Sequence, residues 1–221
     1  MPGAAFTELL NQIEQDAKNI DAANDDLRST LLNTIVAGGF TQFGLSDSTA
    51  PISAQAEVIK GLAEKCMSSA FVTWSHRMTT EYVDRFASPT LRAAYLEQLR
   101  DGSRVGSTAL ATALADKSGK ELLPITFVET DGQFKISGVI PWASNLYEDT
   151  LVVFAARNET TEERIIFATV LSEEGIAVKP AGELLGLNAT SSGTVKFDGL
   201  LLEATHVLTR DVNFFLGQMR P

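Results

Sequence analysis

The spacing of apolar residues changes about halfway along the chain, from a helical period to the alternation typical of strands. In the first half, apolar side chains recur at i, i+3, i+4 and i+7, which indicates the buried face of amphipathic helices. Ser88 before Pro89 predicts a helix cap, as does Thr49 before Pro51. Helices are therefore predicted over 6–17, 27–36, 52–86 with a break near 67–70, and 89–101.

The second half is predicted to form short strands. Asp131 and Gly132 lie between two β-rich runs, and this dipeptide is one of the stronger short signals for a hairpin turn. Further β-type runs follow at regular intervals with turn residues between them, which is typical of a barrel or sandwich. The predicted strands cover 123–130, 133–140, 150–156, 164–171, 176–179 and 194–202, and a last helix is predicted within 211–219.

The two patterns together predict an α+β fold in which a helical domain is followed by a β-barrel domain. Length alone allows one large domain or two small ones, and the change of period places the boundary near Gly102. We therefore expect an N-terminal helical domain over 1–103 and a middle β-barrel domain over 104–208. Residues 209–221 are expected to begin a further helix.

Composition places the chain among globular proteins and excludes several classes of function. Of the 221 residues, 44% are apolar, which is enough for a sizeable core and too many for a disordered chain. The net charge of −10 is spread evenly over both halves, so no nucleic-acid surface is predicted. The single cysteine, Cys66, cannot form an internal disulfide, and we expect it to be buried. With only two histidines as well, no metal site is predicted.

No segment of the sequence predicts a membrane span or a signal peptide. The first residues lack a basic stretch followed by an apolar one. The longest charge-free run, residues 29–46, contains three glycines and several polar residues, so it does not suit a bilayer. The expected compartment is the cytoplasm.

Three uncharged runs are candidates for binding a ligand, because the usual catalytic motifs are missing from the sequence. It has no P-loop, no dinucleotide-binding glycine motif and no G-x-S-x-G elbow. The runs are a small hydroxyl-rich segment (106–115), a Trp beside Ser and Asn after a strand (141–145), and a polar loop that suits phosphate oxygens (186–194). Each has a plain structural alternative: a buried strand or Ala-rich helix, a Trp that anchors the barrel to the helices, and a solvated loop.

Four segments, in this order and at these separations, resemble the acyl-CoA dehydrogenase family. Residues 86–102 resemble its helical stretch around Y-L-P-x-L-A-x-G, and residues 106–118 occupy the place of F-A-L-T-E-P-x-A-G-S-D. Residues 133–145 resemble L-N-G-x-K-x-W-I-T-N-G, and residues 186–198 resemble G-x-R-x-S-x-x-x-x-V-x-F-D-D-V. The resemblance extends over nearly all of the chain.

The resemblance implies an N-terminal helical domain, a middle β-barrel and a C-terminal helical bundle, with FAD between barrel and bundle. Ala111 and Thr112 would approach the pyrimidine side of the flavin, Trp142 would pack against the isoalloxazine, and Ser144 would hydrogen-bond near its reactive edge. Ser118 would lie nearer the acyl thioester. The implied activity is that of an oxidoreductase acting on the CH–CH group of an acyl-CoA in fatty-acid metabolism. The family's base belongs to the bundle, which would begin near Pro221, so no catalytic residue is predicted.

Departures from the family pattern keep two alternatives open. Ala113 and Leu114 replace its Glu-Pro, and Asn188 replaces its common arginine, which bears on the acyl-CoA substrate. One alternative is a flavin-dependent monooxygenase of the same fold, using FMN or FAD, in which His76 would face the active site. Otherwise His76 is expected to be a partly exposed helix residue. The other alternative is a non-catalytic subunit or interaction module without a flavin site. An exposed cofactor face predicts a homo- or hetero-oligomer.

Overall fold

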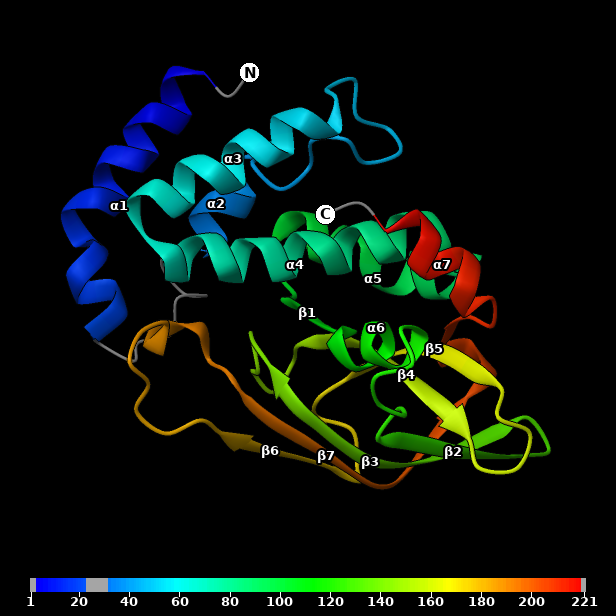
Figure 1. Cartoon of the computed structure of the whole chain (residues 1–221). Coiled ribbons are helices and arrows are strands. Elements are labelled where there is room, and N and C mark those ends of the chain that lie inside the picture. Colours follow the sequence, from blue (N-terminus) through cyan, green and yellow to red (C-terminus); the bar gives the residue numbers. More distant parts are fainter. Residues whose placement is uncertain (1–2, 23–31, 220–221) are drawn as a thin grey trace.

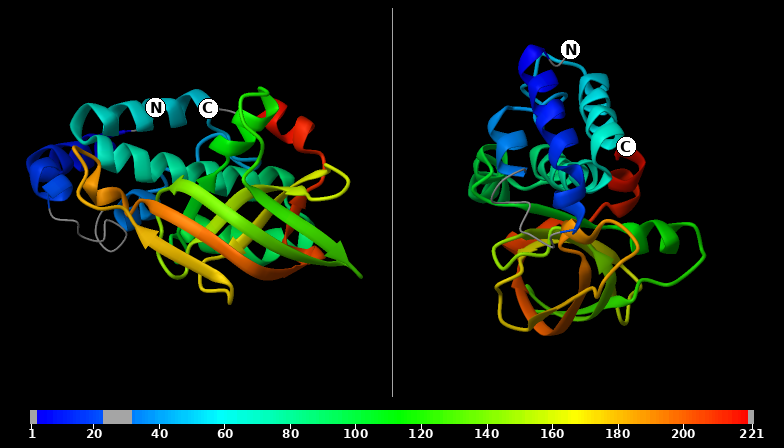
Figure 2. Two further views of the ribbon diagram at one scale, coloured as in Figure 1. Left: turned by 60° about the horizontal axis from the view of Figure 1, so that its bottom comes forward. Right: turned by 90° about the vertical axis from the view of Figure 1, so that its left-hand side faces the viewer.

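The computed structural model describes residues 3–22 and 32–219. Helices occupy the described chain up to Asp101, and strands begin at Gly106. The helices form a layer over the barrel, with α4 crossing above the strands (Figure 1), and the barrel is seen end-on in Figure 2. The helices are α1 (Ala4–Ala22), α2 (Asn33–Ala37), α3 (Ile52–Lys65), α4 (Met67–Phe86), α5 (Pro89–Asp101), α6 (Ala111–Lys117) and α7 (Val212–Gln218).

The helices predicted in the first half are confirmed, with two corrections. The break in the long helix falls at Cys66, which has an extended backbone between α3 and α4 and is buried as expected. Ser88 caps α5, because its Oγ accepts a hydrogen bond from the Leu91 amide at 3.2 Å. Thr49 is not a cap, since Pro51 precedes α3 without a side-chain cap bond. Of the helix predicted over 27–36, the described part is α2 with Leu32 before it, and Leu27 lies outside the described residues.

The predicted strands are also confirmed, and their pairing follows the predicted hairpin. β2 and β3 pair antiparallel up to Thr130 opposite Gln133, around Asp131 and Gly132. Sequence patterning missed β8, which has three residues and is too short for a pattern of alternation. The strands are β1 (Gly106–Ala109), β2 (Ile125–Thr130), β3 (Gln133–Ala143), β4 (Leu151–Asn158), β5 (Arg164–Val170), β6 (Ile176–Pro180), β7 (Gly193–Glu203) and β8 (Val207–Thr209).

β4 is the strand that joins the two layers. The sheet order is β6-β7-β3-β2-β4-β5-β8, and β1 pairs in parallel with the first half of β4. One edge of β4 therefore pairs in parallel with β1 and then with β2, while its other edge pairs antiparallel with β5. A strand in this position is covered on both faces, which explains why Leu151–Ala156 is a continuous apolar run.

Alternate residues of β4 contribute to two separate cores. Leu151, Val153 and Ala155 face the helices and pack with side chains of α4, α5 and α7. The intervening residues point into the barrel, where Phe154 packs against Phe167 and Phe197 with ring centroids 5.8 and 4.6 Å apart. The sheet is thus held to the helices by one face and closed around aromatic rings by the other.

α7 packs on the C-terminal end of α4. Asp211 caps this predicted helix, because its carboxylate accepts from the Phe214 amide at 2.9 Å. Phe215 is fully buried against Tyr82 and Phe86. The domain limits predicted at 103/104 and 208/209 stay predictions. Across 3–22 and 32–219, no helix combines the length and the apolar character that crossing a bilayer requires.

Candidate functional site

The candidate site is organised by α4, which has two different faces. Val72, Ser75, His76 and Thr79 follow the spacing i, i+3, i+4 and i+7, so they share one face, and this face lies against β1. Two positions further on, Trp74, Arg77, Met78 and Glu81 repeat the spacing roughly 200° round the helix. This second face lines a cavity shared with α3. We call these the strand face and the cavity face of α4.

The strand face closes the open edge of β1. The Gly106 amide donates to His76 Nδ1 at 3.1 Å, and the Thr108 amide donates to Ser75 Oγ at 3.3 Å. Asn145 Nδ2 donates both to the Gly106 carbonyl at 3.0 Å and to the Val72 carbonyl at 2.9 Å. Side chains therefore replace the neighbouring strand that β1 lacks on this side, which satisfies buried backbone groups that would otherwise be costly.

Close approach of helix and strand requires the glycine at 106. A Cβ placed there would lie 2.6 Å from the Thr79 Cβ, well inside normal contact distance. His76 is fully buried, so the sequence-based expectation that it is partly exposed is wrong. Because Nδ1 accepts from Gly106, Nε2 is the donor to the Leu99 carbonyl at 3.0 Å, and the ring is neutral. Both ring nitrogens are used by the protein, which removes the argument that His76 faces an active site.

Burial also fixes the charge state of His76. The pKa of His76 is lowered from 6.5 to about 4, mainly by loss of hydration on burial; the hydrogen bond to the Leu99 carbonyl raises this pKa, and the nearby Arg77 charge lowers it. The neutral imidazole is therefore the form present at neutral pH. Its role in the structure is to join the end of α5 to the start of β1.

The side chains of Ser75, His76 and Asn145 that hydrogen-bond to the backbone of β1 form a clamp on this strand. The three candidate runs of the sequence meet next to this clamp. Ser107 Oγ donates to the Ser144 carbonyl at 2.6 Å, which joins the first run to the second. Ser144 Oγ lies 2.6 Å from Ser192 Oγ, which itself lies 2.6 Å from Thr190 Oγ1, so the third run joins as well. We call these four residues, with Asn145, the hydroxyl junction: Ser107, Ser144, Asn145, Thr190 and Ser192. All five are buried, and none is charged.

Backbone strain gathers at the same place. Asn145, Leu187 and Ser191 have φ values of 61°, 64° and 44°, three of the five non-glycine residues with positive φ among those described. Asparagine tolerates this conformation, but leucine does so only at a cost of about 1–2 kcal/mol. The strain is held by hydrogen bonds from the Asn145 and Leu146 amides to the carbonyls of Thr190 and Ser191. Ser191 and Ser192 also line a cavity of about 260 Å³.

The structure corrects one interpretation of these runs and refines another. The run at 186–194 is not a solvated loop, since Thr190 and Ser192 are buried and their hydroxyls bind other protein groups. The run at 106–115 is both of its structural alternatives in succession, because β1 is followed by the short helix α6. Sequence reasoning had singled out all three runs, but nothing in their spacing indicated that their hydroxyls touch.

The predicted site residues lie in two places. Ser144 belongs to the hydroxyl junction, and Trp142, two residues earlier on β3, is 49% exposed. Ala111 and Thr112 begin α6, where the Thr112 Oγ1 is buried without a hydrogen-bond partner among the described residues. Ser118 is exposed at the end of α6 and donates to the Ala115 carbonyl of that helix. The structure thus places Ser144 at the meeting point of the three runs and Ser118 in a solvent-exposed turn.

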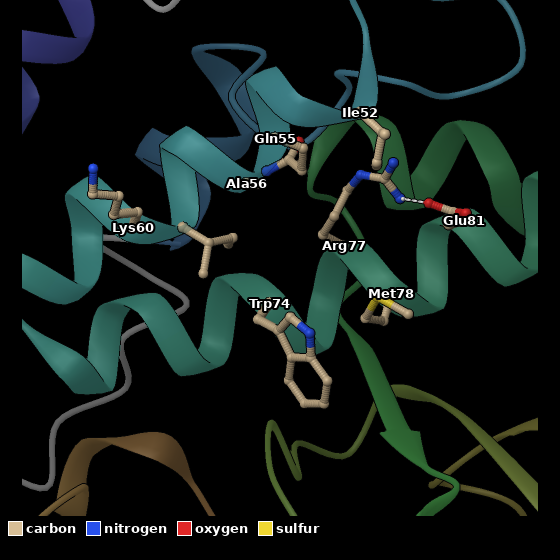
Figure 3. A pocket seen from close by; sticks show the side chains of 9 residues that line it. Ile52, Gln55, Ala56, Lys60, Trp74, Arg77, Met78 and Glu81 are labelled. Carbon is tan, nitrogen blue, oxygen red and sulfur yellow. Dashed lines mark ion pairs between the residues drawn. The ribbon is translucent and has the colours of Figure 1, made fainter. Parts of the chain in front are cut away.

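The cavity face of α4 was not found from the sequence. Together with α3 it lines a cavity of about 420 Å³, bordered mainly by apolar groups that include Ile52 and Trp74 (Figure 3). Ile59 of α3 also lines this cavity. Arg77 and Glu81 form a buried ion pair of 2.8 Å on its wall. Gln55 is also buried there, and its Nε2 donates to the Phe40 carbonyl at 2.9 Å while its Oε1 lacks a partner among the described residues. Charged residues at i and i+4 on a helix usually indicate a solvated face, which hid this site.

Comparison with known proteins finds the same fold in solved structures of flavin-dependent proteins. No protein-family model matches the sequence, and no curated protein matches it. Solved structures do. A structure described as an FAD-dependent dehydrogenase matches with a TM-score of 0.74 and 18% identity, over 96% of this chain and 59% of that one. Glutaryl-CoA dehydrogenase from Mycobacterium smegmatis matches with a TM-score of 0.76 and 14% identity, over 94% and 56%. PigA with FAD and proline matches with a TM-score of 0.69 and 16% identity, over 94% and 58%.

The chain has the fold of acyl-CoA dehydrogenase-type flavoproteins, as the sequence resemblance predicted. It spans less than two thirds of the length of each of these solved chains. Because the sequence identity to these structures is below 20%, the comparison shows a common fold only, and the function has to be argued from the site itself.

The chemistry of the residues present suits a flavin ring. An isoalloxazine is flat, aromatic and bordered by hydrogen-bonding atoms, so it needs an aromatic surface and neutral polar groups. Trp142 offers an exposed indole, and Ser144 offers a hydroxyl two residues away. Thr112 Oγ1 and Asn145 Oδ1 are buried polar atoms without a partner among the described residues. All of these groups are neutral, so they match a neutral ring better than a strongly charged ligand.

Proposed function

We propose that this chain is part of a flavoprotein of acyl-CoA dehydrogenase type that binds FAD beside the hydroxyl junction. The observation that carries the proposal is the meeting of Ser107, Ser144 and Ser192, from three segments far apart in the sequence, at one buried and uncharged point. Backbone strain of the kind found around these residues clusters at active sites and ligand-binding sites. We propose FAD as the cofactor because solved proteins with the same fold bind it.

In this proposal each predicted residue has a separate task. Trp142 packs on the flavin ring, Ser144 hydrogen-bonds to its edge, and Ala111 and Thr112 border its pyrimidine side. FAD, when bound, supplies the acceptor for a hydride. The chain binds and orients the ring and keeps water from it, because the clamp on β1 and the core beneath it leave little freedom to move. The predicted domain division, 1–103 and 104–208, is part of the same proposal.

The proposed substrate is an acyl-CoA thioester, oxidised at a CH–CH group. Ser118 is the proposed contact near the thioester, since it is exposed at the end of α6. The α3–α4 cavity, at about 420 Å³ and mainly apolar, suits the acyl chain. We further propose that a helical domain or partner subunit covers the flavin and supplies the base, and that the protein works in the cytoplasm as an oligomer.

The decisive experiment compares the two tryptophans of the chain during titration with FAD. Trp142 is half-exposed and lies two residues before Ser144 in the chain, whereas Trp74 lines the α3–α4 cavity. We expect Trp142→Ala to weaken FAD binding at least about fivefold, because an aromatic contact contributes about 1 kcal/mol beyond area burial. Trp74→Ala is the matched control and should leave FAD affinity unchanged. Quenching of flavin fluorescence measures both.

The outcomes separate the candidate functions. Failure to bind FAD or FMN would overturn the flavoprotein proposal and favour a non-catalytic module. For a chain that binds flavin, anaerobic addition of an acyl-CoA with the covering domain present should bleach the visible flavin band. Unchanged absorbance there, with oxygen consumption once reduced flavin is supplied, would favour the monooxygenase. His76 does not support the monooxygenase alternative, because it is buried and both of its ring nitrogens hydrogen-bond to the backbone.

A further inference from the structure

Three hydroxyl groups of the junction form a chain that begins at Ser144 and ends at a carbonyl. Ser144 Oγ contacts Ser192 Oγ at 2.6 Å, and Ser192 Oγ contacts Thr190 Oγ1 at 2.6 Å. Thr190 Oγ1 donates to the Leu187 carbonyl at 2.8 Å. Each hydroxyl has one hydrogen to donate and two lone pairs that accept. The positions of the hydrogens follow from this inventory.

The carbonyl end sets the direction of the chain. A carbonyl oxygen only accepts, so the hydrogen between Thr190 and Leu187 comes from Thr190. Thr190 has then used its hydrogen, and the contact with Ser192 needs the hydrogen of Ser192. By the same step Ser144 donates to Ser192. In this arrangement Ser144 Oγ has no hydrogen left for a ligand and offers only lone pairs.

The opposite direction is also open at small cost. If Ser144 donates to a ligand, Ser192 must donate to Ser144 and Thr190 must donate to Ser192. The Leu187 carbonyl then loses the hydroxyl bond but keeps the hydrogen bond from the Thr190 amide, at 3.2 Å. No buried group is left without a partner, so the large penalty for an unmade hydrogen bond does not arise. Because a carbonyl ends the chain, it can reverse its hydrogens but cannot carry a proton away.

We propose that Ser192 and Thr190 are positioning residues that let Ser144 act either as an acceptor or as a donor toward the flavin. The proposal rests on the proposed function, since the flavin is the ligand. A flavin ring nitrogen that accepts a hydrogen bond in the oxidised state carries a hydrogen in the reduced state. A hydroxyl that reverses can bind both states, whereas a fixed donor favours the oxidised state alone.

Thr190→Val gives a directional test. Valine has nearly the shape of threonine but accepts no hydrogen bond, so Ser192 can donate only to Ser144, and Ser144 becomes a fixed donor. We expect reduced FAD to bind about tenfold more weakly relative to oxidised FAD than in the wild-type chain. A tenfold change in this ratio lowers the two-electron midpoint potential of bound FAD by about 30 mV. Spectroscopic titration against a dye of known potential measures it.

Three further variants keep the test independent of stability. Thr190→Ser retains the hydroxyl and should keep the wild-type potential. Ser192→Ala removes the partner of Ser144 in both directions, so both flavin states should bind more weakly with a smaller change in their ratio. Ser191→Ala changes a neighbouring hydroxyl outside the chain and serves as the matched control. Thermal unfolding of each variant identifies any that do not fold, and the ratio is then read from the remaining variants.

The results test the reversible hydroxyl chain from Ser144 to Thr190, here called the relay, separately from the flavin site. The relay is supported if the midpoint potential is lower in Thr190→Val than in the wild-type chain and unchanged in Thr190→Ser. Wild-type binding of FAD with an unchanged potential in Thr190→Val, or equal weakening of both flavin states, would overturn the relay and leave the flavin site standing. Binding of neither FAD nor FMN by the wild-type chain would overturn both.

Discussion

The two faces of α4 use buried polar residues in opposite ways. On the strand face, Ser75 and His76 hydrogen-bond to the backbone of β1, and Asn145 completes the clamp from the other side. On the cavity face, Arg77 and Glu81 pair with each other along the wall of a largely apolar cavity of about 420 Å³. The same helix therefore presents a closed contact on one side and open space on the other.

The difference shows which part of the molecule is built to stay fixed and which part is built to receive something. The strand face has no spare volume, since even a methyl group at position 106 would meet Thr79. The cavity beside the other face retains volume, and Gln55 Oε1, which reaches it from α3, has no hydrogen-bond partner among the described residues; both lower stability unless a ligand or partner uses them. We therefore expect substitutions at the strand face to lower the free energy of unfolding much more than substitutions at the cavity.

Asn145→Asp is expected to have the largest effect, because it breaks the clamp with almost no change of shape. The amide Nδ2 donates to two buried carbonyls, and an aspartate oxygen would face both of them as an acceptor with a charge. An unpaired buried charge costs about 3–5 kcal/mol. Aspartate tolerates the positive φ of this position, so the backbone effect is small. Urea unfolding measures the loss.

The matched control is the same substitution at Asn188. This residue is only half-buried. Its Oδ1 accepts from the Leu184 amide, a bond that aspartate keeps, and its Nδ2 donates to one carbonyl, that of Leu184, a bond that aspartate loses. Asn188→Asp should therefore cost about 1 kcal/mol, well below the loss at Asn145. Equal losses at the two positions would contradict the view that the clamp on β1 is a special feature of the junction.

The next effect is a dependence of stability on pH that comes from His76. Its folded-state pKa is about 4 against 6.5 when unfolded, so between these values the unfolded chain binds a proton that the folded chain does not. The free energy of unfolding should therefore fall as the pH drops from about 6.5 to 4, by up to about 3 kcal/mol. Denaturant unfolding across this pH range measures the slope.

His76→Gln tests the assignment, since glutamine has a donor and an acceptor but does not titrate. The variant should be less stable at pH 7 and lose most of the slope between pH 6.5 and 4. Asp116 does not confuse the result, because its hydrogen bond with Arg164 holds its pKa below the ordinary value of 3.8 and its effect belongs to more acidic conditions. A wild-type slope retained in His76→Gln would assign the titration to another group.

Most of the fold could be predicted from the sequence, because its signals are local. The hairpin at Asp131-Gly132 and the cap at Ser88 each depend on a few neighbouring residues. β8 could not be predicted, since three residues have no period of their own and gain order only by pairing with β5. The position of the break at Cys66 was found to within a few residues for the same local reason.

The candidate site was predictable only in parts. Composition singled out Ser144 and the run containing Ser192, but these residues are 48 positions apart, and their contact depends on the pairing of β3 with β7. His76 was expected to be partly exposed, because the sequence does not reveal that β1 packs against it. The cavity face escaped notice because Arg77 and Glu81 resemble a solvated pair until α3 covers them.

Gln55→Leu is expected to have the smallest effect. Gln55 lies on α3 and lines the cavity opposite the cavity face of α4, so this variant completes the comparison. The substitution loses the hydrogen bond to the Phe40 carbonyl, which costs about 1 kcal/mol, but it also removes the buried Oε1 that has no partner among the described residues. Leucine adds apolar contact along the cavity, so the two terms nearly offset and the free energy of unfolding should change by less than about 1 kcal/mol. Urea unfolding alongside Asn145→Asp measures both faces under one set of conditions. A loss of more than about 2 kcal/mol would mean that Gln55 is clamped as firmly as Asn145, and that the cavity face is as closed as the strand face.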